Sequence, residues 1–144
     1  MISLDEFRIM HSKLIEHYQY VEKWLEYIYA SLREKHLYEG LEEVEKSNST
    51  EILKRISKIE HDKSITVFTE QQYTEIKTLI ERRNFWTHEC YVDMVFDRKT
   101  DAPKKESDIA KLYMDIEEAS RVREWLFQKQ YEMVSTVKAP GGFR

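Results

Sequence analysis

The chain has 144 residues, 41% of them apolar and 35% charged, and its formal net charge is −4. This composition fits one globular domain, and the acidic balance excludes a generic basic coat for nucleic acid, so any nucleic acid must be bound by a local patch. A single cysteine, Cys90, excludes an internal disulfide. Only 3 Gly and 2 Pro are present, which favours a few long helices over a sheet of many strands.

The N-terminal segment carries no sign of export or membrane insertion. Its first residues, MISLDEFRIM, include acids, and no uncharged run in the chain exceeds six residues. A lone cysteine suits a reducing compartment. We therefore predict a cytoplasmic protein with no membrane partner.

Residues 3–35 repeat apolar side chains at three- and four-residue spacing, which predicts a long amphipathic helix. His11 is the one polar residue that interrupts this stripe. A second stripe of Tyr20, Trp24 and Tyr27 lies beside the first and indicates a buried partner surface. A helix that packs between two neighbours of its own chain explains the extra aromatic width equally well.

The periodicity breaks around Gly40, and the pair Asn48 and Glu51 has the spacing of a capping box. A second helix is expected from there to His61. The β-branched stretch 63–69 predicts a short extended connector, and Thr69 with Gln72 forms another capping pair at the start of a third helix.

We expect the third helix to span 70–97, followed by a polar loop at 98–108 and a last helix over 104–137. The tail 138–144 contains Pro and Gly and is expected to be flexible. Residues 1–137 would then form a single domain. The predicted fold is all-α, an antiparallel up-and-down bundle of four to five helices.

Several kinds of site are excluded by spacing. None of the five histidines has a Glu three residues before it, no His-x-x-x-His pair exists, and one cysteine cannot build a structural zinc site. Phosphate-binding Gly-rich loops and Gly-x-Ser-x-Gly elbows are also missing. We expect neither a metal nor another cofactor.

The stretch ERRNFWTHECYVDM (81–94) places polar residues in an otherwise apolar helical pattern. On an α-helix, Arg83 and His88 would point roughly 140° apart and lie about 7.5 Å apart along the axis. Asn84, His88 and Tyr91 would form one polar line, with Arg83 beside an apolar row. A guanidinium in that position needs a carboxylate of its own chain or an external anion. From spacing alone, an internal salt bridge and an ordinary, partly buried histidine are favoured.

The segment RNFWTH (83–88) resembles the Arg-(Asn/Asp/His)-x-x-x-His motif of the HEPN superfamily. The long aromatic first helix, the central motif helix and the long last helix are similar to that family's bundle over most of the chain. The resemblance implies a metal-independent endoribonuclease, often a toxin or phage-defence component, that dimerises so that both motifs line one cleft. It assigns catalysis to Arg83 and His88, with Asn84 as the supporting polar residue.

These residue types suit RNA cleavage, because the 2′-OH of RNA is the nucleophile and needs only a proton acceptor and charge stabilisation. A histidine titrates near pH ~6.5 and can accept the proton, and arginine can bind two phosphate oxygens. A two-fold interface would bring in a second copy of each residue. The candidate RNA-binding residues around the motif are Arg82, Tyr91, Arg98 and Lys99. Lys104 and Lys105 are better explained as a solvated loop and helix end.

In HEPN toxins that pair with a nucleotidyltransferase-type antitoxin, a modified tyrosine often stands two residues after the motif histidine. Here Cys90 occupies that place and Tyr91 follows it, so control by tyrosine modification is in doubt. The sequence also leaves open whether an acidic residue such as Glu16 or Glu22 joins the site. The main alternative is a non-catalytic HEPN-like module for dimerisation or protein interaction, and a third option is a nucleotide or other small-ligand binder.

Overall fold

The computed structural model describes residues 2–33, 35–91, 96, 97, 99, 100 and 102–136. Within them the chain forms five α-helices, one π-helical turn and two strands of two residues each. In chain order these are α1 (Leu4–Leu32), α2 (Leu37–Val44), α3 (Ser49–Lys63), α4 (Glu70–Asn84), η1 (Phe85–Glu89), β1 (Phe96–Asp97), β2 (Ala102–Pro103) and α5 (Glu106–Ser135).

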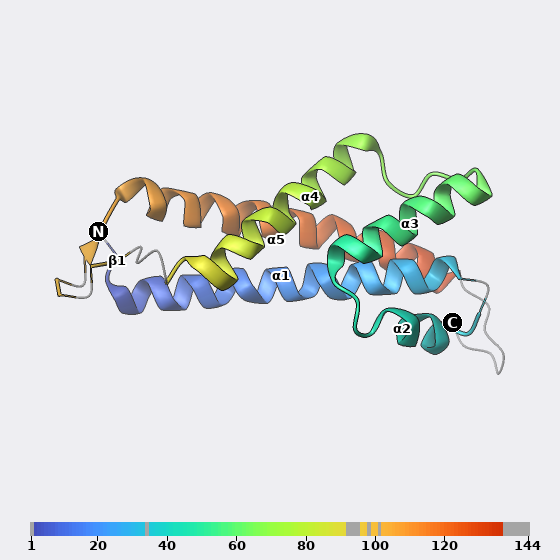
Figure 1. Ribbon diagram of the computed structural model, residues 1–144, viewed down its shortest axis with the longest axis horizontal. Helices are drawn as coiled ribbons and strands as arrows, with labels where there is room; N and C mark the ends of the chain where they lie inside the picture. Colours follow the sequence, from blue (N-terminus) through green and yellow to red (C-terminus); the bar gives the residue numbers. More distant parts are fainter. Residues whose placement is uncertain (1, 34, 92–95, 98, 101, 137–144) are drawn as a thin grey trace.

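The predicted all-α bundle is confirmed, with α1 and α5 as its two long elements (Figure 1). Successive helices run in opposite directions, so the first and fifth are parallel. Contacts show the same direction, because His17 meets Arg123 and, further along both helices, Trp24 meets Phe127. α3 and α4 pack over this pair, and α2 lies at the C-terminal end of α1.

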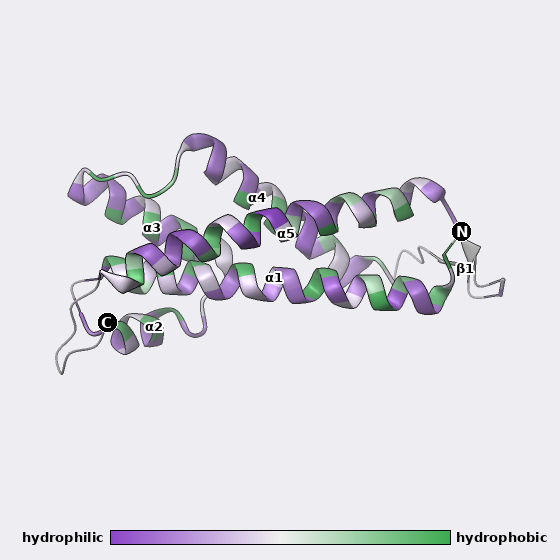
Figure 2. Cartoon of the chain, turned by 180° about the vertical axis from the view of Figure 1, so that it is seen from behind, coloured by the Kyte–Doolittle hydropathy of each residue, from purple (hydrophilic) through white to green (hydrophobic). Residues whose placement is uncertain are grey.

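The apolar stripe of α1 forms the centre of the core. The Ser3 hydroxyl caps the helix by accepting from the Glu6 N–H at 3.1 Å. Side chains at three- and four-residue spacing are then buried, and each contributes about 1.5–3 kcal/mol on leaving water. They are Phe7, Leu14, Tyr18, Val21, Leu25 and Ile28. Figure 2 shows apolar residues as stripes along the helices, with hydrophilic ones between them. None of the described helices combines the length and apolar composition that crossing a bilayer requires.

Gly40 does not end a helix, although the sequence pattern breaks there. It lies within α2, at the point where α2 meets α1. A Cβ on Gly40 would lie 2.9 Å from the Cα of Ala30 and 3.1 Å from its carbonyl oxygen. The glycine therefore permits a close approach of two helix backbones, and α2 is a helix that the sequence pattern did not predict.

Asn48 and Thr69 are the N-caps of the two central helices, as predicted, and the full capping box is confirmed for Thr69 with Gln72. The Asn48 side chain accepts from the Glu51 N–H at 2.9 Å, and Thr69 and Gln72 form a reciprocal capping box. Between α3 and α4 the chain is non-helical, as expected for 63–69, although α3 itself extends to Lys63 rather than His61. The carboxylate of Glu60 holds this connector by accepting from two of its backbone N–H groups.

The third predicted helix is wrong beyond residue 89. α4 ends at Asn84, η1 follows, and Phe96–Asp97 pairs antiparallel with Ala102–Pro103 instead of continuing a helix to 97. The π turn shifts the backbone from i→i+4 to i→i+5 bonding, shown by the Cys90 N–H bonding to the Phe85 carbonyl. The last helix begins at Glu106 rather than at 104 and ends at Ser135. The tail 138–144 lies outside the described residues.

The close contact at Gly40 predicts an unusual response to substitution. Glycine to alanine inside a helix normally stabilises by about 0.5–1 kcal/mol. In Gly40→Ala, the new methyl group would collide with the Ala30 backbone, so we expect unfolding free energy to fall by about 1–3 kcal/mol in urea denaturation. Glu42→Ala, on the exposed side of α2, is the control and should stay within about 0.5 kcal/mol. A more stable Gly40→Ala would contradict the observed packing.

Candidate functional site around the π turn

Trp86 anchors the motif segment to α5. Its side chain is 1% exposed, and its indole N–H donates to the Asp115 carboxylate at 2.6 Å. Arg82 Nε donates to the same carboxylate oxygen at 2.8 Å. Arg82, a predicted RNA-binding residue, therefore has a structural partner inside the chain. One third of its side chain remains exposed.

His11 anchors the same segment to α1. Its Nε2 lies 2.6 Å from the carbonyl oxygen of Trp86, and because a carbonyl only accepts, Nε2 must carry the proton. The Cys90 thiol donates to the same oxygen at 3.2 Å. The ring of His11 also stacks on Phe7. Sequence reasoning had no function for His11, but its place as the one polar residue in an apolar stripe was the signal.

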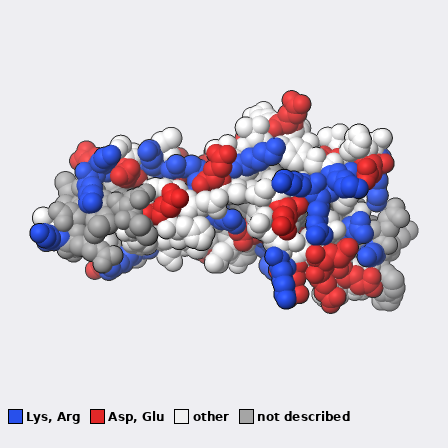
Figure 3. Space-filling model, in the orientation of Figure 1, with Lys and Arg blue, Asp and Glu red and all other residues white. Residues whose placement is uncertain are grey.

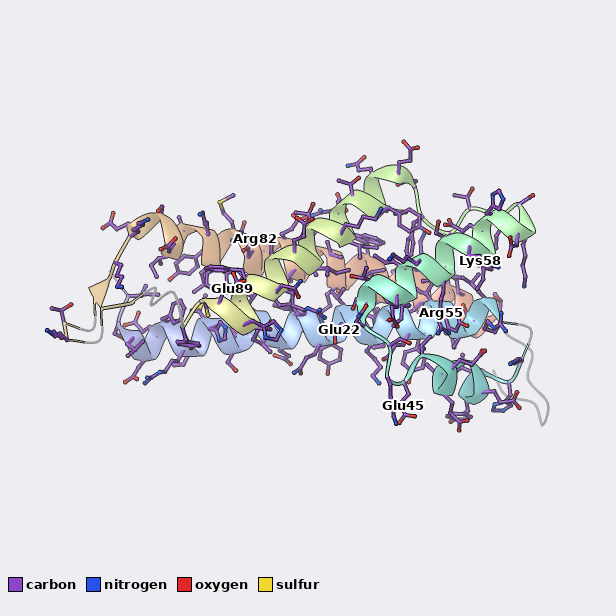
Figure 4. The ribbon with its side chains drawn as sticks, in the orientation of Figure 1. Glu22, Glu45, Arg55, Lys58, Arg82 and Glu89 are labelled. Carbon is purple, nitrogen blue, oxygen red and sulfur yellow. The ribbon has the colours of Figure 1, made fainter. Side chains whose placement is uncertain are left out.

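Arg83 forms an ion pair with Glu22 of α1, and its Nη2 donates to the Asn84 side chain at 3.3 Å. Glu22 is one of the two acids that the sequence left open, and Figure 4 shows it in the middle part of α1. Burial lowers the pKa of the Arg83 guanidinium, and Tyr18 opposes that shift. The buried Tyr18 hydroxyl has no hydrogen-bond partner among the described residues. Burial, followed by the Asp115 charge, raises the Tyr18 pKa.

His88 differs from both arginines because it is exposed and its ring makes no hydrogen bond or ion pair within the described residues. It lies in η1, where the wider turn brings residues five apart closer to one face. Arg83 itself belongs to α4, before η1 begins at Phe85, so the separation of roughly 140° was calculated for a continuous α-helix, which the segment from Arg83 to His88 is not. π turns of this kind are frequent at functional sites.

The predicted polar line of Asn84, His88 and Tyr91 is divided between two neighbours. Asn84 lines a cleft between α3 and α4. Tyr91 packs edge-on against the Phe7 and His11 rings of α1, with ring centroids 5.8 Å and 5.2 Å away. It is 42% exposed, and partial burial, followed by the Cys90 thiol, raises its pKa.

Two further candidate RNA-binding residues, Arg98 and Lys99, lie close in sequence to the two short strands. Lys99 is exposed in the turn between β1 and β2, whereas Arg98 lies outside the described residues. Lys104 and Lys105 are exposed just before α5, as expected for a solvated helix end. Over the described part of the chain, no cluster of three or more His, Cys, Asp or Glu side chains is placed to hold a metal ion.

A second feature, which we call the aromatic surface, lies along α1 and α5 and comprises Tyr20, Trp24, Tyr27, Phe127 and Tyr131. Neighbouring rings in this row have centroids 5.2 to 6.2 Å apart. The Trp24 indole N–H is buried without a partner among the described residues. On the wheel of α1, Tyr20 and Trp24 point about 160° away from Glu22, which places this surface opposite the motif.

Arg123 borders the aromatic surface and joins it to His17. Its guanidinium lies 3.8 Å from the centroid of the Tyr20 ring, a cation–π contact, and donates to His17 Nδ1 at 3.1 Å. Burial, followed by the Arg123 charge, lowers the His17 pKa. The neutral histidine is therefore the form that fits this surface.

No protein-family model, curated protein or solved structure matches the chain.

The shared carboxylate at Asp115 predicts a large loss of stability when it is removed. Asp115→Ala would leave Arg82 and the Trp86 N–H without their acceptor, and we expect unfolding free energy to fall by about 2–3 kcal/mol. Glu118→Ala, which breaks a surface pair on the same helix, should cost at most about 0.5 kcal/mol. Equal losses in urea denaturation of both variants would show that Asp115 does not anchor the turn.

Proposed function

We propose that the chain is a HEPN-like, metal-independent endoribonuclease. The observation that carries this proposal is the arrangement of the motif around η1. Arg83 and Asn84 are hydrogen-bonded to each other, while His88 is open to solvent on a π turn that two long helices hold in place. A positioned cation and an accessible proton acceptor, here within one short segment of chain, are what cleavage through the 2′-OH requires.

In the proposed reaction, neutral His88 takes the proton of the 2′-OH, and the oxygen attacks the adjacent phosphorus. The bond to the 5′-oxygen breaks, and that oxygen leaves as a hydroxyl after receiving a proton from an imidazolium or from water. The products are a 2′,3′-cyclic phosphate and a 5′-OH end. Arg83 binds the phosphate oxygens on which negative charge accumulates, and Asn84 orients the Arg83 guanidinium.

The proposal includes a homodimer whose two motifs face each other. The interface must include the surface around His88, because that side chain has to reach the shared cleft. The aromatic surface does not meet this condition, since it lies on the other side of α1 from Glu22 and Arg83. A second copy of His88 would supply the imidazolium that protonates the leaving oxygen.

A cytoplasmic toxin–antitoxin or phage-defence role belongs to the same proposal. Cys90, at the position where related toxins often carry a modified tyrosine, is buried and bonded to the Trp86 carbonyl. A nucleotidyltransferase-type antitoxin would therefore have to modify Tyr91, whose side chain is 42% exposed. RNA and this antitoxin are the partners that we propose.

Purified protein should cleave single-stranded RNA in the presence of EDTA and leave 2′,3′-cyclic phosphate ends. His88→Ala removes the proton acceptor and should lower the cleavage rate by about 10²–10⁴-fold, with an unchanged melting temperature because His88 is exposed. His61→Ala, an exposed histidine on α3, is the matched control and should cleave like the wild type. Cleavage that survives in both His88→Ala and Arg83→Ala would rule the proposal out.

A second candidate function is a non-catalytic HEPN-like dimerisation module, and two observations favour it. The ion pair between Arg83 and Glu22 satisfies the motif arginine within one chain. The aromatic surface presents a row of rings, and the Trp24 N–H at its centre has no hydrogen-bond partner within the part of the chain that the structure describes. Homodimer interfaces are rich in aromatic side chains, and a second copy of the chain would cover this row.

Replacing two exposed rings of the aromatic surface tests this second candidate. It expects Tyr20→Ser combined with Tyr131→Ser to convert a dimer to a monomer in light scattering, with no RNA cleavage by either protein. Tyr113→Ser, which changes an exposed ring of α5 outside the surface, should leave the dimer intact. A double variant that stays dimeric would rule out the aromatic surface as the interface.

A further inference from the structure

A cleft of about 760 Å³ opens between α3 and α4, beside the motif. Its apolar floor is formed by Leu53 of α3 and by Tyr73 and Ile80 of α4. This size lies within the range of pockets that bind small organic ligands. Asn84, the second residue of the motif, forms part of the wall, so the cleft is continuous with the candidate site.

Two lysines supply positive charge at the cleft. Lys54 and Lys77 line it from opposite helices, and neither forms an ion pair within the described residues. By contrast, Lys58 of the same helix α3 is paired with Asp62 at 3.2 Å. The Lys77 ammonium lies 5.9 Å from the centroid of the Tyr73 ring, at the apolar floor. Figure 3 shows basic side chains gathered over α3 and acidic ones over α2.

The rest of the lining is polar and suits sugar and base groups. Thr50 and Ser57 bring hydroxyls from α3, while Glu70 and Glu81 bring carboxylates from α4. Carboxylates accept hydrogen bonds from ribose hydroxyls and from exocyclic amines. Glu81 is four residues from Lys77, but the two form no ion pair within the described residues, so both groups remain available to a ligand.

We propose that this cleft binds a nucleotide. Its phosphate lies between Lys54 and Lys77, and its ring packs on the floor formed by Leu53, Tyr73 and Ile80. The nucleotide is either one unit of an RNA strand that continues past Asn84 to His88, or a free mononucleotide. The RNA source rests on the proposed ribonuclease function, whereas binding of a free nucleotide does not.

The test compares two ligands on the full-length chain. Adenosine 5′-monophosphate binding is measured by calorimetry on the wild type. Binding of a fluorescent eight-nucleotide single-stranded RNA is measured by anisotropy on His88→Ala, so that the strand is not consumed. Each protein is also made with Lys54→Gln and Lys77→Gln together. Both lysines are exposed, so the variant should fold, which its melting temperature checks.

We expect the double substitution to weaken binding by about tenfold or more. The control is Lys13→Gln, a single substitution on the exposed side of α1 opposite Glu22, which should change binding by less than about twofold.

If the double substitution weakens RNA binding, the cleft is a site for an RNA strand. If it weakens binding of the mononucleotide alone, the cleft is a site for a free nucleotide. Unchanged binding of both ligands, or no binding to the starting proteins, overturns the proposal. Lysine-dependent binding of the mononucleotide without any RNA cleavage would refute the proposed ribonuclease function but support the proposal that the cleft binds a nucleotide.

Discussion

Trp86 is the residue on which the arrangement of the site depends, because it ties the motif segment to both long helices at once. Its indole N–H reaches Asp115 of α5, and its carbonyl oxygen accepts from His11 of α1. Burial of an indole of this size contributes about 4–6 kcal/mol at about 25 cal/mol per Å². The two hydrogen bonds add direction, since both partners would be left unsatisfied if the segment slid along the bundle.

The π turn follows from the same contacts. The Cys90 N–H bonds to the Phe85 carbonyl, one residue earlier than in an α-helix, so the Trp86 carbonyl is open to side chains. His11 and the Cys90 thiol both use it. The wider turn is thus stabilised by tertiary contacts, and it presents His88 to solvent while Trp86 stays buried.

How much the sequence could predict depended on the range of the interactions involved. Caps such as Thr69 with Gln72 and the core stripe of α1 depend on residues within one or two turns, so their spacing was sufficient. The break in the pattern at Gly40 was misleading, because the glycine allows close packing against Ala30 of another helix and does not end its own helix. The end of α4 was missed for a similar reason. The π turn that follows α4 is held by the bond from His11 to the Trp86 carbonyl, and these two residues are 75 positions apart in sequence.

The contacts around the candidate site could not be predicted from the sequence. The resemblance to the HEPN motif singled out Arg83, Asn84 and His88 as candidates, but no spacing rule pairs Arg83 with Glu22 or Arg82 with Asp115. The α3–α4 cleft was also invisible, because Lys54 and Lys77 come from separate helices whose approach is set by packing. Adjacent arginines with identical chemistry therefore have different structural roles, which only the fold determines.

The ion pair between Arg83 and Glu22 is compatible with both candidate functions, and its energetics explain why. Burial disfavours the charged guanidinium, so an Arg83 without a partner would destabilise the free protein. Glu22 offsets that penalty before any phosphate is present.

A guanidinium has five N–H donors, and the bonds to Glu22 and Asn84 leave others for a phosphate. A carboxylate partner therefore does not prevent Arg83 from binding an anion. The feature that separates a ribonuclease from a structural module is instead His88, whose exposed ring makes no hydrogen bond or ion pair with the residues that the structure describes.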